Sequence, residues 1–315
     1  MKNKKLMTVL IIISMTIFYS GCIESLDDNG NTLEKNVKNM RTDAWYATIQ
    51  EAINESQEND TLMVEPGIYE ELIIISKEIL LIGSGPTKTI IQGNYTEDGI
   101  TITADNVYVE GFTVKGGGDN TNSNVNAGID VRSNNNHIKN CIITDNDHYG
   151  MYVYGSHNNI ITNCTFYQNE DRGLYFYSST GNTVKNNTMT DEEYGLYCIS
   201  VEDSIFEENS ISDTAHKGVY FGSDSTKNIF KNNIVKNNVD GVHIKGSTEN
   251  TFLDNLLLNN TKGLYFCCGG SDNLVYNNVF FNNDDHSYGY PNNTYSYQNI
   301  GNFWDDYNGT DVDND

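Results

Sequence analysis

A short repeat constrains the fold of this chain more than any other sequence feature. A glycine followed by an apolar, a variable and a second apolar residue recurs every 22 or 23 residues, at Gly128, Gly150, Gly173, Gly195, Gly218, Gly241 and Gly263. A second column keeps the same step, at Cys141, Cys164, Asn187, Asn209, Asn233, Asn255 and Asn278. Two columns in register over so many copies indicate a solenoid of stacked units rather than a domain around one central core.

Within each copy, apolar residues alternate in three short stretches separated by turn residues, which is the pattern of short strands. A propeller blade needs about 40 residues, and a leucine-rich repeat needs a regular leucine framework. The repeat therefore predicts an all-β, right-handed, single-stranded parallel β-helix. Each coil of about 22–23 residues contributes three strands, and each strand pairs with its equivalent in the next coil at a spacing of about 4.8 Å.

Composition argues against a nucleic-acid partner and against a mainly helical fold. The 315 residues carry a formal net charge of −24, which argues against a nucleic-acid partner, because binding phosphates needs clustered basic side chains. Asparagine accounts for 46 residues, which suits a chain full of turns and not a helical protein. We expect a monomer.

The N-terminus has the features of an export signal. Lys2, Lys4 and Lys5 precede an apolar run that is too short for a comfortable membrane span. The small residues before Cys22 look like a lipoprotein box, with an ordinary signal peptide as the alternative. We expect residues 1–21 to be a lipoprotein signal peptide and Cys22 to carry lipid. Residues 22–45 would form a flexible tether to the outer face of the cytoplasmic membrane or the cell surface.

The repeats and their flanks resemble the right-handed parallel β-helix, or pectin-lyase-like, superfamily. Residues 46–98 look like that family's opening, with a short capping helix around Thr48–Ser56 and the first coils, and residues 99–283 hold the repeats. Residues 284–315, with the ending GNFWDDYNGTDVDND, are similar to the tail of NosD-like proteins with carbohydrate-binding and sugar-hydrolase repeats, which are common on the surface of methanogenic archaea. This resemblance implies a surface lipoprotein, or an accessory role in copper-enzyme maturation.

The asparagine column has a structural explanation, because Asn tolerates turn conformations and its amide can bond to the next Asn in the stack. Cys141 and Cys164 replace Asn at adjacent positions, where their Cα atoms come within reach of a disulfide. Stacked parallel side chains need a particular torsion to join, so we expect buried free thiols. Cys198 is expected in the core.

Strand alternation places a column of aromatic residues on the outside, two residues after each glycine. Aromatic rings bind the C–H faces of sugars, so this column predicts a glycan-binding face; the alternative is simple stacking between neighbouring strands. The expected glycan-binding residues are Tyr152, Tyr175, Tyr197, Tyr220, His243 and Tyr265.

A column of titratable residues lies two positions before the glycines. Asp171, Glu193, Arg172 and His216 are candidates for acid–base catalysis, and His148 and His216 for metal binding; a solvated turn is the alternative. The acidic ending with Asp311, Asp313 and Asp315 is spaced like the start of a calcium loop, so calcium is the one cofactor that the sequence raises.

The interpretation that joins these features is an exported, membrane-anchored β-helix that binds polysaccharide or cell-surface glycan on its tyrosine-lined face. A lyase or glycoside hydrolase using the same face is the first alternative, although polygalacturonase, lyase and epimerase motifs are missing. A structural envelope protein or adhesin, with columns that only hold the coils together, is the second.

Overall fold

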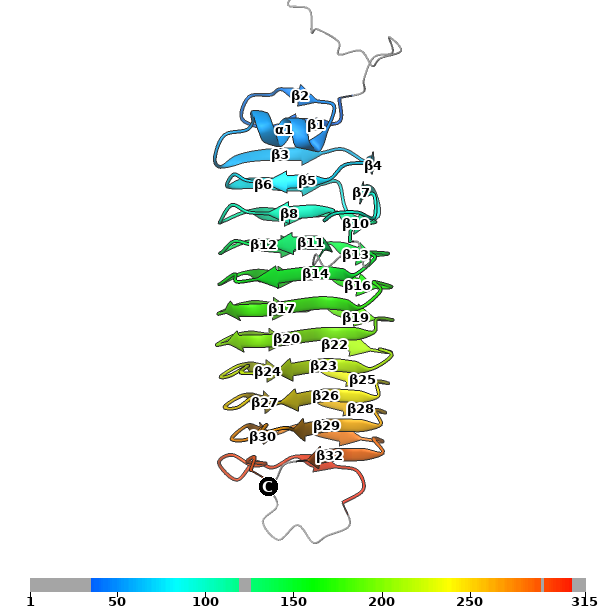
Figure 1. Ribbon diagram of the computed structural model, residues 1–315, viewed down its shortest axis with the longest axis vertical. Coiled ribbons are helices and arrows are strands. Elements are labelled where there is room, and N and C mark those ends of the chain that lie inside the picture. The colour runs from blue at the N-terminus through cyan, green and yellow to red at the C-terminus, as the bar shows by residue number, and fades with distance from the viewer. Residues whose placement is uncertain (1–34, 119–125, 290–291, 308–315) are drawn as a thin grey trace, which may run out of the picture. The chain divides into compact units, whose positions relative to one another are not determined.

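The computed structural model describes residues 35–118, 126–289 and 292–307. They form a stack of coils with one short helix, α1 (Ile49–Glu55), at its N-terminal end (Figure 1). The predicted signal peptide, Cys22 and the three tail residues Asp311, Asp313 and Asp315 lie outside the described residues.

Each coil contributes a strand to each of three sheets. The twelve-stranded sheet contains, in order, β2 (Trp45–Tyr46), β1 (Val37–Asn39), β3 (Asp60–Val64), β6 (Ile79–Gly83), β9 (Tyr108–Glu110), β12 (His137–Lys139), β15 (Ile160–Thr162), β18 (Thr183–Lys185), β21 (Ile205–Glu207), β24 (Ile229–Lys231), β27 (Thr251–Leu253) and β30 (Leu274–Tyr276). The eleven-stranded sheet contains β33 (Phe303–Trp304), β31 (Val279–Phe281), β28 (Leu256–Leu258), β25 (Ile234–Lys236), β22 (Ser210–Ser212), β19 (Thr188–Thr190), β16 (Thr165–Tyr167), β13 (Ile142–Thr144), β10 (Thr113–Lys115), β7 (Thr89–Gln92) and β4 (Gly67–Tyr69). The ten-stranded sheet contains β32 (Asp285–Gly289), β29 (Lys262–Cys267), β26 (Asp240–Lys245), β23 (Lys217–Gly222), β20 (Tyr194–Glu202), β17 (Arg172–Thr180), β14 (Tyr149–Tyr154), β11 (Ala127–Val131), β8 (Ile100–Ile102) and β5 (Ile73–Ile75).

Pairing within the coils is parallel and in register. Tyr175 of β17 lies opposite Tyr152 of β14 on one side and Tyr197 of β20 on the other. Antiparallel pairing among the described strands occurs where β1 meets β2 and β3. The predicted parallel β-helix is confirmed, with its three strands per coil and its helix at the N-terminal end.

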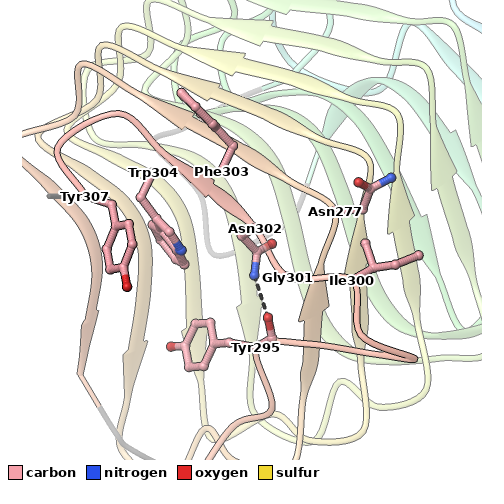
Figure 2. Close-up of a pocket in the computed structure, with 8 residues that line it drawn as sticks. All are labelled: Asn277, Tyr295, Ile300, Gly301, Asn302, Phe303, Trp304 and Tyr307. Atoms are coloured by element: carbon pink, nitrogen blue, oxygen red, sulfur yellow. Dashed lines mark hydrogen bonds between the residues drawn. The ribbon is translucent and has the colours of Figure 1, made fainter. Parts of the chain in front are cut away.

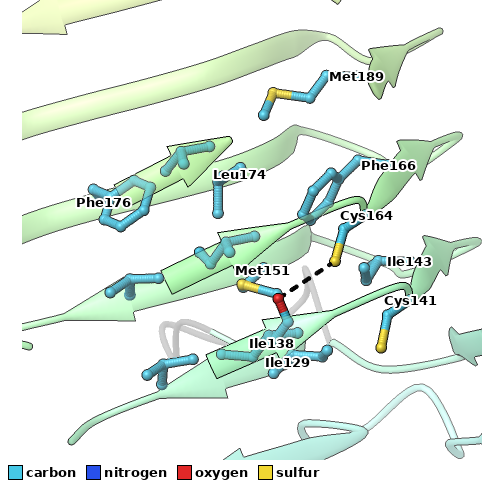
Figure 3. Close-up of a cluster of buried hydrophobic side chains, with 14 of the residues drawn as sticks. Ile129, Ile138, Cys141, Ile143, Met151, Cys164, Phe166, Leu174, Phe176 and Met189 are labelled. Carbon is cyan, nitrogen blue, oxygen red and sulfur yellow. Dashed lines mark hydrogen bonds between the residues drawn. The ribbon is translucent and has the colours of Figure 1, made fainter. Parts of the chain in front are cut away.

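The core runs along the inside of the stack, because every second residue of each strand points inward. Leu174 and Phe176 of β17 are fully buried, as their spacing predicts. The rings of Phe176, Phe206 and Phe221 meet edge to face, with centroids 5.9 and 5.5 Å apart along this series. Apolar side chains from successive coils therefore form one continuous core (Figure 3).

The glycine column has a steric cause. A Cβ atom added to Gly150 would lie 2.6 Å from the carbonyl oxygen of Gly173 and 2.8 Å from Nδ2 of Asn169. Real Cβ atoms do not come so close to backbone, so only glycine lets the coils stack at this corner. The repeat that organises the sequence is therefore a packing requirement.

The asparagine column forms a buried hydrogen-bonded ladder. The backbone N–H and Nδ2 of Asn233 donate to Oδ1 of Asn255 at 2.9 and 3.1 Å, and Nδ2 also donates to the carbonyl of Phe206. The left-handed conformation belongs to the residue before the ladder position: φ is 55° at Asn232 and 54° at Asn186. The turn conformation expected of the ladder asparagines is therefore taken by their neighbours instead.

Two further ladders flank the predicted one. One passes through Asn136, Asn159, Asn182, Ser204, Asn228, Asn250, Asn273 and Asn293. The other consists of two runs, Asn146–Asn169–Glu192 and Thr214–Asn238–Asn260–Asn283. At most of these positions a side-chain oxygen accepts from a buried backbone N–H of the neighbouring coil.

Cys141 and Cys164 are buried and free, as expected. The thiol of Cys164 points at the carbonyl oxygen of Ile138, 3.8 Å away (Figure 3). Cys198 is fully buried in the core, and burial raises the pKa of its thiol. These three cysteines act as small core residues.

Both ends of the stack are closed by folded segments. Thr48 caps α1 by accepting a hydrogen bond from the backbone N–H of Glu51 at 3.1 Å, and Ile49, Ala52 and Ile53 are buried. The regular structure begins at β1, inside the segment expected to be a tether. Val37 of this strand is completely buried, so this part of the segment packs on the core.

At the other end, part of the expected tail is also folded. Asp285–Gly289 forms β32, which adds a strand to the ten-stranded sheet, and Phe303–Trp304 forms β33 on the eleven-stranded sheet. The ring of Trp304 stacks on Phe280, with centroids 4.3 Å apart, and covers the last turn of the core.

Candidate functional site

The outer face of the ten-stranded sheet carries three rows of side chains that run along the stack. The tyrosine row, two residues after each glycine, contains Asp130, Tyr152, Tyr175, Tyr197, Tyr220, His243 and Tyr265, and Tyr288 continues it in the strand register. The flanking row, one residue before each glycine, contains Ala127, Tyr149, Arg172, Tyr194, Lys217, Asp240 and Lys262, and Asp285 continues it. The outer row, four residues after, contains Tyr154, Tyr177, Ile199, Gly222, Lys245 and Cys267.

The structure places the predicted tyrosine row outside the core, but its rings are less exposed than the sequence analysis expected. Tyr152 and Tyr220 are only 6% and 8% exposed, because neighbouring rings cover them. The outer row is more accessible, with Tyr154 46% and Tyr177 37% exposed. A ligand on this face would therefore meet the outer row as well as the tyrosine row.

Rings from successive coils contact one another along the whole face. Tyr197 and Tyr220 stack with centroids 4.5 Å apart, and Tyr154 and Tyr177 stack at 5.7 Å. His243 lies in the same row, close to Tyr265, with centroids 4.4 Å apart. Both interpretations of the row, stacking and ligand binding, are thus compatible with its geometry.

Arg172 is held inside a box of tyrosines that the sequence analysis did not anticipate. Its guanidinium carbon lies 4.8, 4.7, 5.7 and 4.2 Å from the ring centroids of Tyr149, Tyr175, Tyr194 and Tyr197. Its Nη1 atom donates to Asp171 at 2.9 Å, and its buried Nε atom has no hydrogen-bond partner among the described residues. The box fixes one positive charge in the middle of an aromatic face.

The predicted titratable row forms separate pairs. Nε2 of His148 lies 3.9 Å from Asp171, and Nε2 of His216 lies 3.0 Å from Glu193. Burial raises the pKa of Asp171, the charge of Arg172 opposes that shift, and Glu193 adds to it. Burial also lowers the pKa of His148, and Arg172 lowers it further. Within the described part of the chain, neither His148 nor His216 belongs to a cluster of three potential metal ligands.

A pair of carboxyl groups lies at the N-terminal end of the same face. Asp130 is completely buried and accepts a hydrogen bond from Nε of Arg132 at 2.5 Å, and among the residues that the structure describes its Oδ1 atom has no donor. Asp98 accepts from the N–H of Ala127 at 2.8 Å and lies within hydrogen-bonding reach of Asp130. Burial and the neighbouring Asp98 charge raise the pKa of Asp130 to about 7. Asp98 also lines a surface cavity of about 420 Å³.

A larger cavity of about 610 Å³ lies where the C-terminal segment folds back on the stack (Figure 2). Its lining includes the aromatic residues Tyr295, Trp304 and Tyr307 together with the amides Asn277 and Asn302. Nδ2 of Asn302 donates to the carbonyl oxygen of Tyr295 at 2.8 Å, which fixes one wall.

Near this cavity, His286, Asp305 and Asp306 have the side-chain types of a metal site. Nδ2 of Asn283 donates to the carbonyl of Leu257 and approaches Nδ1 of His286 at 3.3 Å, so Nδ1 acts as an acceptor. The proton then sits on Nε2, which faces Asp305 at 2.8 Å. This hydrogen-bond pattern suits a neutral imidazole that donates from Nε2 to the Asp305 carboxylate.

The comparisons with known proteins agree with the fold. Residues 127–280 match the family described as the right-handed beta helix region. A cell surface glycoprotein of Methanothermus fervidus is 33% identical over 148 residues, which cover 46% of this chain and 22% of that protein. The chain thus spans about a fifth of the length of this relative.

Several solved structures share the architecture. The A-module of mannuronan C-5 epimerase AlgE6 from Azotobacter vinelandii has a TM-score of 0.60 at 14% identity, covering 81% of this chain and 92% of that one. Pectate lyase Pel9A has a TM-score of 0.57 at 15% identity, covering 79% and 73%. At such identities the likeness establishes the fold. Among the described residues, no helix is long and apolar enough to cross a membrane.

Proposed function

We propose, because the chain belongs to the right-handed parallel β-helix superfamily, that it is a cell-surface protein that binds glycan along the outer face of its ten-stranded sheet. The observation that carries the proposal is the continuous aromatic face in which Tyr154 and Tyr177 remain exposed beside the boxed Arg172. The surface location is supported by the relative from Methanothermus fervidus, which is named a cell surface glycoprotein.

The physical chemistry of the face suits a sugar chain. Exposed tyrosine rings offer apolar surface and phenol hydroxyls to sugar rings, each contributing about 1 kcal/mol. Arg172 and Lys217 add positive charge within a chain of net charge −24, so a carboxylated or sulfated glycan would be favoured over a neutral one. Weak contacts repeated from coil to coil favour a long, linear ligand.

A glycan array with the full chain, followed by affinity electrophoresis on the best polymer, tests the proposal. The variant with Tyr154→Ala and Tyr177→Ala should lose most of its retardation and keep its melting temperature, because both side chains are exposed. Phe281→Ala is the matched control, since Phe281 is an equally exposed aromatic residue on the eleven-stranded sheet. Equal retardation of all three proteins would remove the face as the binding site.

A polysaccharide lyase or hydrolase is the second candidate, and the Asp98–Asp130 pair favours it. A carboxyl group with a pKa of about 7 beside a cavity can donate a proton at neutral pH, and a neighbouring carboxylate can accept one. Incubation with the bound polymer and analysis of reducing ends separates binding from turnover. Cleavage that disappears in Asp130→Asn would place the chemistry at this pair, and cleavage lost only in Glu193→Gln would place it at the titratable row.

The proposal includes a lipid anchor at Cys22, which would hold the protein on the outer face of the cytoplasmic membrane. Cys22→Ser should release the protein from the membrane fraction of expressing cells. Cys268→Ser is the control, because Cys268 is an exposed cysteine of the folded stack. Equal retention of both variants would show that the attachment does not depend on Cys22.

A further inference from the structure

Three side chains on two neighbouring strands form a linear hydrogen-bonded series. Asp240 and His243 lie on β26, and Cys267 lies at the end of β29. Nδ1 of His243 is 2.9 Å from Oδ2 of Asp240, and Nε2 is 3.2 Å from Sγ of Cys267. A nucleophile next to a base, with the base held by a third group, is the arrangement that activates thiols and hydroxyls.

The protonation states follow from the surroundings. Burial favours the neutral form of Asp240, but the hydrogen bond from His243 and the charge of Lys262 outweigh it and hold the pKa of Asp240 below its ordinary value. The carboxylate therefore accepts the proton on Nδ1, which leaves the lone pair of Nε2 facing the sulfur. Burial and the adjacent thiol of Cys268 raise the pKa of Cys267 to about 11, so Cys267 is a thiol at neutral pH.

We propose that Cys267 is a nucleophile, with His243 as its general base and Asp240 as the positioning residue, in a site that cleaves acyl esters. Cys267 is partly exposed, so its sulfur is open to a ligand on the outer face. Lys245 lies directly opposite Cys267 in the strand register and adds a positive charge near the carbonyl oxygen of a bound ester.

The reaction balances without any further cofactor. Sγ attacks the ester carbonyl while its proton moves to Nε2 of His243; the C–O bond then breaks, and the alcohol leaves with that proton. A thioester on Cys267 remains. Water then attacks the thioester with His243 taking its proton, the C–S bond breaks, and the proton returns to the sulfur as the carboxylic acid leaves.

The position of the series indicates the class of ester. His243 interrupts the tyrosine row, with its ring 5.3 Å from that of Tyr220 and 4.4 Å from that of Tyr265. A sugar chain lying along the row would place its substituents over Cys267. The natural substrate class is therefore an acyl ester carried by a glycan, and this assignment of the substrate rests on the proposed function.

The triad itself is tested with a small ester that needs no glycan. The full chain is mixed with p-nitrophenyl acetate, release of p-nitrophenol is followed, and acid-quenched samples are analysed by tandem mass spectrometry. We expect an acetyl group on Cys267 and a release rate that falls to background in Cys267→Ala. His243→Gln should slow acylation by about 100-fold, which is the typical contribution of a general base.

Two variants separate positioning from folding. Asp240→Asn should slow acylation, and Asp240→Glu should restore part of the rate, while both keep the wild-type melting temperature within a few degrees; a residue that only holds the strands together would not show this difference. Cys268→Ser is the matched control and should react at the wild-type rate or faster, since it retains Cys267 and loses the neighbouring thiol that opposes ionisation.

Acetylation that is absent from Cys267, or equally fast in His243→Gln, would overturn the proposal and would show that the series only ties β26 to β29. That result leaves glycan retention by Tyr154 and Tyr177 unaffected. Conversely, a protein that acetylates Cys267 but binds no glycan keeps the triad and loses the proposed substrate.

Discussion

Asn169 donates two hydrogen bonds to Glu192, from its backbone N–H to Oε2 at 3.0 Å and from Nδ2 to Oε1 at 2.7 Å. Glu192 occupies a ladder position where the preceding coil carries an asparagine, and its side chain is buried. Burial raises its pKa to about 9, so the carboxyl group is neutral at neutral pH. The neutral acid can accept both hydrogen bonds without placing a negative charge in the buried ladder.

This relationship makes stability depend on pH. Because the folded-state pKa of about 9 lies above the ordinary value of 4.5, the stabilisation is complete below about pH 4.5 and is lost as the pH rises through 9. Glu192→Gln keeps the shape and cannot ionise. We expect it to be more stable than the wild type by about 2–4 kcal/mol near pH 8 and nearly equal to it near pH 5. Urea unfolding at both pH values checks this, and a constant difference would contradict it.

Asn233→Leu should destabilise the stack, because it removes the acceptor of two hydrogen bonds from Asn209 and the side-chain donor to the carbonyl of Phe206. The expected loss in the free energy of unfolding is about 1–3 kcal/mol. Asn232→Gly is the control: Asn232 is exposed and already left-handed, so glycine fits there. If chemical denaturation showed the same change for both variants, the ladder would not be a source of stability.

Asp98→Asn should lower the pKa of Asp130 from about 7, because the negative charge of Asp98 opposes ionisation of the buried Asp130 carboxyl. The direction follows from removing one of two like charges. Carbon-detected NMR titration of labelled aspartate carboxyls measures the shift. A titration of Asp130 that is unchanged in the variant would show that burial alone sets its pKa.

Trp304→Ala should open the C-terminal end of the core by removing the ring that stacks on Phe280. We expect a loss of about 2–4 kcal/mol in the free energy of unfolding, as for other large aromatic truncations. Phe303→Ala, at the exposed neighbouring position, should change stability by less than about 0.5 kcal/mol. Thermal unfolding of both variants distinguishes a cap from a loose surface segment.

The repeat predicted the coil, the direction of strand pairing and the inward columns. In a solenoid, equivalent positions of successive coils have the same packing, so their residue types recur at a fixed spacing in the sequence. Leu174 and Phe176 point inward and Tyr175 outward for the same reason that every equivalent triplet does. The glycine spacing alone located these positions, and no long-range contact had to be inferred.

The chemistry of the face was harder to predict, because it depends on residues that do not repeat. Tyr149, Arg172, Tyr194 and Lys217 lie in the flanking row, but no one side-chain type is kept along it, so the row gives no signal at the step of one coil. Asp240 and Cys267 are brought to one histidine only by the stacking of β26 on β29. Aligning each residue with its equivalent one coil later would have placed Lys245 opposite Cys267 and exposed the cluster.

The close approach at the glycine column also limits how such a chain can change its length. The step from Gly99 to Gly128 is 29 residues, yet a Cβ on Gly99 would still lie 2.8 Å from the carbonyl oxygen of Gly128. Additional residues are therefore accepted between two contacts of this column, provided that the contact itself is restored. Evolution can lengthen a turn or duplicate an entire coil, whereas the loss of one residue beside the glycine would move every later side chain out of register.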